Sequence, residues 1–278
     1  MAAFVHLHLH TEYSLVDGAV RIASERSEDG SVRREGLMDA VARLGMPAVA
    51  LTDQTNLFAL VKFYRAAQKA GIKPLVGVDA LLHESAEGAK PSRLVLLCRD
   101  RTGYGNLTRL ITRAYLEGQG KHGPVLHREW LEDGNASGLI ALSGASDGDV
   151  GRAIMAGRHG VARKALNRWL KLFGENYYLE LQRTGREGDE SCIEGSLKLA
   201  VAAGVPVVAT NDVRFLSKED FEAHEARVCI HDGNLLADAS RPKRYSEEQY
   251  LRSPEEMTEL FADLPEALDN SVEIAKRL

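Results

Sequence analysis

Up to about residue 210, short apolar runs alternate along the chain with amphipathic stretches. The runs are rich in Val, Leu, Ile or Tyr, and most are bounded by Gly, Pro, Asn or Asp, as is typical of buried strands. The predicted strands span residues 4–10, 47–52, 74–82, 93–98, 138–143, 177–182 and 205–210.

Between these runs, apolar residues recur with the spacing of a helix that buries one face. Leu60, Tyr64 and Ala67 follow this spacing, and Gly71 ends the same helix. The pattern predicts helices over residues 35–45, 58–71, 103–118, 158–174 and 194–204. The polar stretch 23–35 is predicted to be a surface loop.

Strands separated by helices indicate βα units and a parallel sheet. Seven such strands predict a closed or nearly closed α/β barrel, with an open doubly wound sheet as the alternative. No GxGxxG or P-loop motif follows any of the runs, and the sequence therefore disfavours a nucleotide-binding sandwich fold.

Beyond residue 215 the pattern is purely helical, with helices predicted over 217–233, 253–264 and 265–278. Ser253, Pro254 and Glu256 form a capping box at the start of the second of these helices. The last helix stops without a C-cap. We therefore expect a single domain over 1–278, cut from the N-terminus of a longer chain, with the barrel over about 1–215 and a helical extension over about 216–278.

The charge balance bears on possible partners. Lys and Arg number 35 against 40 Asp and Glu, which gives a net charge of -5. Domains that bind nucleic acid by themselves usually have more basic than acidic residues, so we expect contact with DNA only through a longer chain. Three cysteines without CxxC spacing argue against a disulfide framework and a zinc ribbon, and favour reduced thiols in the cytoplasm. No secretory signal and no apolar stretch near the ~20 residues of a membrane span is found.

Three histidines alternate in the stretch HLHLHT, residues 6–11. In a strand His6, His8 and His10 share one face, with neighbours roughly 6–7 Å apart. That spacing suits two imidazoles in one zinc or manganese cluster. It also suits hydrogen-bonded histidines on a polar strand face, and the histidines alone leave both interpretations open.

Carboxylates recur near the ends of other predicted strands, where α/β barrels carry their chemistry. These residues are Asp17, Asp53, Asp79, Glu180 and Asp212. Their gathering at one rim favours a site that descends from a metal centre.

Several stretches together resemble one family: FVHLHLHTEYSLVDG, ALTDQTNLFALVKFYRAAQKAGIKPLVGVD, TGYGNL and PVVATNDVRFL. They resemble, in order, the polymerase-and-histidinol-phosphatase (PHP) domain of the bacterial DNA polymerase III alpha subunit, of the gamma-proteobacterial type. The resemblance covers nearly the whole chain. It implies a distorted seven-stranded (β/α) barrel, similar to a TIM barrel, with extra C-terminal helices. It also implies a parent DNA-directed DNA polymerase of replication whose polymerase aspartates lie outside this chain.

Family members with an intact site bind up to three metal ions, often zinc or manganese. The resemblance implies that five metal-ligand positions of the family are retained in this chain: His8, His10, Asp17, Asp79 and Asp212. Four ligands are replaced: Gln54, Arg93 and Arg214 stand where the family has histidine, and Ala145 stands where it has cysteine.

Arginine cannot bind a metal and brings a permanent positive charge. We therefore expect Arg93 and Arg214 to form an ion-pair network with the aspartates of the rim. Those aspartates are Asp17, Asp53, Asp79 and Asp212. The expected cofactor is none, or a weakly bound divalent ion such as zinc, manganese or magnesium.

The resemblance implies a scaffold with no catalytic residue in this fragment. Such a domain docks the separate 3′–5′ proofreading exonuclease subunit, and contacts the rest of the alpha chain and other polymerase III holoenzyme subunits, with no membrane partner. The alternative is a residual metal-dependent phosphoesterase, either a 3′–5′ exonuclease or a pyrophosphatase. The four lost ligands favour the scaffold. A standalone histidinol-phosphatase-like enzyme is a third possibility, which the stretches NLFALVKFYRAA and TGYGNLTRLI disfavour.

Overall fold

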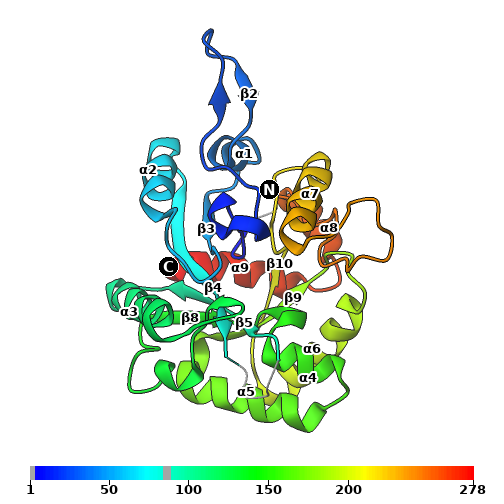
Figure 1. Ribbon diagram of the computed structural model, residues 1–278. Helices are drawn as coiled ribbons and strands as arrows, with labels where there is room; N and C mark the ends of the chain where they lie inside the picture. Colours follow the sequence, from blue (N-terminus) through cyan, green and yellow to red (C-terminus); the bar gives the residue numbers. More distant parts are fainter. Residues whose placement is uncertain (1–3, 84–88) are drawn as a thin grey trace.

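The computed structural model describes residues 4–83 and 89–278 (Figure 1). Six strands form one curled sheet in the order β10-β9-β8-β5-β4-β3. Their bounds are β3 Ala48–Leu51, β4 Lys73–Leu82, β5 Ser92–Cys98, β8 Leu139–Leu142, β9 Tyr177–Gln182 and β10 Val207–Thr210. Each lies within or close to a strand that the sequence predicts.

The direction of β5 departs from the prediction. β5 runs antiparallel to both β4 and β8, whereas the other neighbouring pairs are parallel. The prediction of an all-parallel sheet is therefore wrong at this strand. Only residues 83–91 separate β4 from β5, and a parallel pair needs a crossover of a dozen or more residues. As a result, the beginning of β5 lies at the rim where β4 ends.

The first predicted strand, residues 4–10, is extended but irregular. Its ladder pairing is a single bridge from Leu9 to Val213, and its backbone bonds reach the two edges of the sheet. The amide of Ala50 donates to the His6 carbonyl at 2.9 Å, and the amide of His10 donates to the Val213 carbonyl at 2.9 Å. The segment closes the barrel between β3 and the chain after β10. Among the described residues the barrel sheet thus has six regular strands where seven are predicted.

The helices surround this sheet (Figure 1). Their bounds are α1 Leu37–Arg43, α2 Leu60–Ala70, α3 Arg101–Glu117, α4 Asp149–Met155, α5 His159–Phe173, α6 Asp189–Ala203, α7 Phe221–Asp232, α8 Pro254–Leu260 and α9 Pro265–Arg277. Only α4 has no counterpart in the prediction. The predicted capping box is present at α8, where Ser253 Oγ accepts from the Glu256 amide at 3.1 Å. Within the described ranges, no helix is both long and apolar enough to cross a bilayer.

The stretch 23–35, predicted as a loop, contains a small exposed hairpin. Its strands are β1 Glu25–Arg26 and β2 Val32–Arg34, and they project away from the barrel (Figure 1). A second short hairpin, β6 Gln119–Gly120 and β7 Gly123–Pro124, follows α3.

The C-terminal helices belong to the barrel core. Residues from all six strands form the inner cluster, and Ile274 and Ala275 of α9 pack into it. The Val5 amide also donates to Ser271 Oγ of α9 at 3.2 Å. α9, which lies in the predicted helical extension, therefore supplies part of the barrel core.

Candidate functional site

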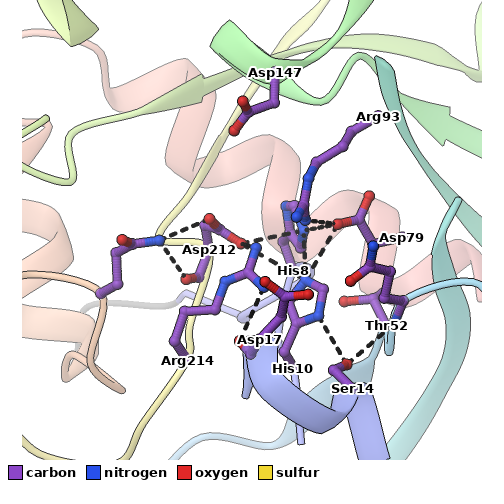
Figure 2. A network of polar contacts seen from close by, with 12 residues as sticks. His8, His10, Ser14, Asp17, Thr52, Asp79, Arg93, Asp147, Asp212 and Arg214 are labelled. Carbon is purple, nitrogen blue, oxygen red and sulfur yellow. Dashed lines mark hydrogen bonds and ion pairs between the residues drawn. The ribbon is translucent and has the colours of Figure 1, made fainter. Parts of the chain in front are cut away.

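A cavity of about 740 Å³ opens at the rim where the parallel strands end, and charged side chains line its deep end. Asp17, Arg93, Asp147, Asp212 and Arg214 all face it. Figure 2 shows how these side chains converge with His8, His10 and Asp79. Most of the residues predicted from the sequence thus meet at one place.

His8 and His10 come from the irregular segment that closes the barrel. Their Nε2 atoms lie 3.2 Å apart, and both side chains are buried. His6 lies elsewhere, with its Nε2 atom 2.9 Å from the Arg252 carbonyl. The predicted alternation fails because Val5 and Leu7 pack inside the barrel, whereas Leu9 packs under α1 and α2. The three histidines therefore do not share one face.

Asp79 and Arg93 form the first ion pair of the site. Asp79 is fully buried on β4, and the Arg93 guanidinium from the beginning of β5 contacts its Oδ2 atom. The same oxygen lies 3.5 Å from His8 Nε2 and 3.3 Å from His10 Nε2. Burial opposes ionisation of Asp79, but Arg93 together with His10 and His8 holds the pKa of Asp79 well below its usual value.

Asp212 and Arg214 form the second ion pair, just after β10. Arg214 Nη2 lies 2.6 Å from Asp212 Oδ1, and the arginine is only 1% exposed. Gln249 Nε2 donates to the other carboxylate oxygen at 2.7 Å. Burial would raise the pKa of Asp212, but the nearby guanidinium lowers it. The pair is therefore a buried, hydrogen-bonded charge pair.

Asp17 lies between the two arginines without a direct ion pair to either. Arg214 Nη1 donates to the Asp17 backbone carbonyl at 3.1 Å, and the Tyr245 hydroxyl donates to the Asp17 carboxylate. Burial opposes ionisation, yet Arg93 and then Arg214 lower the pKa of Asp17. Tyr245 was not expected at the site, because the stretch between α7 and α8 has no pattern that reveals a partner.

Asp53 differs from its predicted role. Its carboxylate accepts from the Thr11 amide at 2.7 Å, from Thr11 Oγ1 at 2.7 Å and from Ser14 Oγ at 2.6 Å. No arginine lies within ion-pair distance of Asp53 in the part of the chain that the structure describes. Burial raises its pKa. Asp53 thus anchors the turn after the first segment and is not a member of the arginine network.

Gln54 and Ala145 occupy the two remaining lost-ligand positions. Gln54 is half-buried and lines the cavity, and its backbone amide donates to Ser14 Oγ at 3.1 Å. Ala145 is buried in the turn after β8 with φ 46°. A methyl group there offers no ligand atom to a metal.

Glu180 on β9 is the residue that the ligand assignment missed. Its carboxylate lies 2.7 Å from His8 Nδ1 and accepts from Thr210 Oγ1 at 2.5 Å and from the Gly144 amide at 3.0 Å. It therefore fixes the orientation of the His8 ring. The sequence feature that could have identified it is a carboxylate in a strand otherwise made of Tyr, Leu and Gln.

The hydrogen bonds indicate which ring nitrogens of His8 and His10 carry a proton. The Ser14 hydroxyl donates to Asp53, so it accepts from His10 Nδ1–H at 2.9 Å. This leaves His10 Nε2 as an acceptor for His8 Nε2–H, while His8 Nδ1–H donates to Glu180. Burial alone would lower the pKa of His8, but Glu180 and Asp212 raise it to about 10. Burial and then Arg214 lower the pKa of His10 to about 3.

A family model described as the PHP domain matches residues 20–184, which is more than half of the chain. The chain belongs to the PHP domain family. This confirms the family that the motifs around His8, Asp53 and Asp212 indicate.

Relatives extend the match to nearly the whole PHP chain. It is 51% identical over 275 residues to the DNA polymerase III subunit alpha of Pseudomonas aeruginosa, and 49% identical over 274 residues to that of Escherichia coli K12. Each alignment covers 99% of this chain and 22% of the relative. The chain therefore spans about a fifth of the length of these relatives.

The fold of the PHP chain is similar to that of an amidohydrolase from Chromobacterium violaceum, solved with bound sulfate and no metal. The TM-score is 0.51 at 16% sequence identity, over 81% of this chain and 97% of the other. This likeness supports the barrel architecture.

The residues of the PHP site fit one divalent ion. His8, His10 and Asp212 present ligand atoms within 4.8 Å of one another, so these three can converge on one divalent ion. A larger cluster does not fit. The Asp79 oxygen that faces the histidines contacts Arg93, and the Asp212 oxygen that faces them contacts Arg214. Each guanidinium adds a positive charge where a second cation would sit.

Proposed function

We propose that this PHP domain is part of a DNA polymerase III alpha subunit and serves it as a scaffold without catalytic metal. The identity of about half over 99% of the chain to two such subunits supports the parent protein. The parent would be a DNA-directed DNA polymerase of replication, acting in the bacterial cytoplasm, and it would contact DNA through parts outside this chain.

One observation supports the proposed loss of the metal cluster. Two positions that hold histidine ligands in the family hold arginine here, and both arginines contact aspartates at retained ligand positions: Arg93 meets Asp79, and Arg214 meets Asp212. A guanidinium neutralises a buried carboxylate as a metal would, but it supplies no Lewis acid and no activated water. The old site is thus proposed to stabilise the fold.

His8, His10 and Asp212 are the specific observation in favour of a residual ion. Bound there, a divalent ion would polarise a phosphoester and lower the pKa of a bound water. Arg214 contacts the same Asp212 carboxylate and competes with such an ion. We therefore propose that the phosphoesterase alternative is the weaker one.

Metal content per chain tests this function. The purified chain is dialysed against zinc and then manganese, freed of unbound ion, and measured by mass spectrometry. The matched control is a variant with the family ligands restored: Gln54→His, Arg93→His, Ala145→Cys and Arg214→His. We expect the control to retain metal and the unmodified chain to retain almost none. Retention of one or more ions by the unmodified chain would overturn the proposal.

The scaffold would also dock the 3′–5′ proofreading exonuclease subunit, beside the rest of the alpha chain and other holoenzyme subunits. Binding of the purified exonuclease subunit from the same organism can be measured by isothermal titration calorimetry against the folded chain. Saturable binding is the expected result, and no heat of binding to a chain with native circular dichroism would refute the docking.

A further inference from the structure

The cavity carries an excess of positive charge although the chain carries a net charge of -5. Seven lysines and arginines line it against four aspartates, which leaves an excess of three positive charges among the described lining residues. The excess is local, and a local excess marks a surface for a negatively charged partner.

The deep end of the cavity is already balanced. Arg93 contacts Asp79, Arg214 contacts Asp212, and Arg186 Nη1 lies 3.0 Å from Asp147. These ion pairs form the floor of the cavity. The unbalanced charge lies at the rim. Lys90 and Lys121 are exposed, and neither has a carboxylate within 4.0 Å in the described parts of the chain. An anionic partner therefore gains most at the rim.

Apolar side chains share this rim. Leu15 is 69% exposed and Phe58 is 62% exposed, yet both line the cavity. The Phe58 ring lies 5.9 Å from the Tyr115 ring, so the turn before α2 and the helix α3 together present one apolar wall. Large apolar side chains exposed around a concavity are typical of interaction sites.

We propose that this cleft docks an acidic peptide segment that carries apolar side chains. Its carboxylates would pair with Lys90 and Lys121, its apolar side chains would cover Leu15 and Phe58, and its neutral backbone would cross the balanced floor. The peptide is favoured over a nucleic acid strand because a strand carries a phosphate at every nucleotide, whereas the two lysines without a carboxylate partner among the described residues, Lys90 and Lys121, lie at the rim. A strand would also carry phosphates over the floor carboxylates.

The inference rests on the proposed function, because metal ions on the floor would change its charge. Metal content is therefore measured on the same samples, after treatment with a chelator. If metal remains, the proposed function fails. If no metal remains and the peptide does not bind, only the docking inference fails.

A displayed library of short random peptides is selected on the folded 278-residue chain. The enriched peptides are synthesised, and their dissociation constants are measured by fluorescence anisotropy. We expect enrichment of Asp or Glu together with Leu, Ile or Phe. The double variant Lys90→Glu/Lys121→Glu should weaken binding about tenfold, as expected when two exposed charge pairs turn repulsive.

The matched control reverses two exposed lysines of α5, Lys164→Glu/Lys171→Glu, which gives the same net charge away from the cleft. We expect it to leave the affinity nearly unchanged. Phe58→Ser tests the apolar wall and should also weaken binding, because it removes a side chain that supports no core. Peptides without acidic enrichment, equal losses in both double variants, or tighter binding of oligothymidylate at the same lysines would each overturn the inference.

Discussion

The Arg93 guanidinium contacts the Asp79 carboxylate across two antiparallel strands. Asp79 lies opposite Val95 in the register, and Leu81 lies opposite Arg93. The contact depends on the reversed direction of β5, which brings the first residues of that strand to the rim. In a parallel β5 the same position would lie at the opposite end of the barrel.

We predict that Arg93→Ala destabilises the domain strongly. The change leaves Asp79, which is fully buried, without its cation, and breaking such a pair costs about 3 to 5 kcal/mol. The free energy of unfolding in urea, followed by circular dichroism, measures the loss. The control is Arg99→Ala, which removes an exposed guanidinium 3.3 Å from Asp100 and should cost less than about 1 kcal/mol.

A second substitution separates charge from packing in this prediction. Asp79→Asn in the Arg93→Ala background removes the unpaired charge, so it should recover part of the lost stability. Equal costs for Arg93→Ala and Arg99→Ala would contradict a structural role for the buried pair.

The sequence predicts most of the helices and strands, but not the direction of β5. Alternating apolar runs and amphipathic stretches are strong local signals, so the six sheet strands and the long helices are found. Strand direction is set by the connection, and the short stretch 83–91 between β4 and β5 was the available sign. α4 spans only Asp149–Met155, which is too short for a helical period to stand out.

For the candidate site too, the sequence predicts many of the residues but not which of them contact one another. The sequence names the histidines, arginines and aspartates of the rim, because motifs are local. Which arginine meets which aspartate depends on the direction of β5 and on the turn at Asp212, where φ is 44°. Tyr245 reaches Asp17 from a distant segment without regular structure, and no local pattern encodes such a contact.

We predict that Tyr245→Phe loosens the segment between α7 and α8. The change removes the hydroxyl that donates to Asp17, and losing a hydrogen bond to that half-buried carboxylate should cost about 1 to 3 kcal/mol. Hydrogen exchange should rise over residues 233–252 more than in the barrel strands. Tyr64→Phe serves as the control, since the Tyr64 hydroxyl accepts a hydrogen bond from Gln68 Nε2 at the surface. Unchanged exchange over 233–252 would count against a fastening role for Tyr245.

Two isoleucines test whether the C-terminal helices are part of the barrel. Ile274 of α9 is fully buried among residues of the sheet, whereas Ile230 of α7 is 81% exposed. We expect Ile274→Ala to cost about 2 to 5 kcal/mol, as for large-to-small changes in a core. Ile230→Ala should stay within about 0.5 kcal/mol of the unmodified chain. Similar unfolding free energies for the two variants would show that α9 is an appendage.

The last prediction concerns acid stability and His224. This imidazole is fully buried beside Phe215 and Tyr245, and burial and then Arg214 lower its pKa to about 4. An unfolded chain would protonate it near pH 6.5. Its contribution is therefore fully present above about pH 6.5 and is lost as the pH falls toward about 4, by up to about 3 kcal/mol. Unfolding free energies measured across this range should fall less steeply for His224→Leu than for the unmodified chain. Parallel slopes for the two proteins would show that another group governs the acid transition.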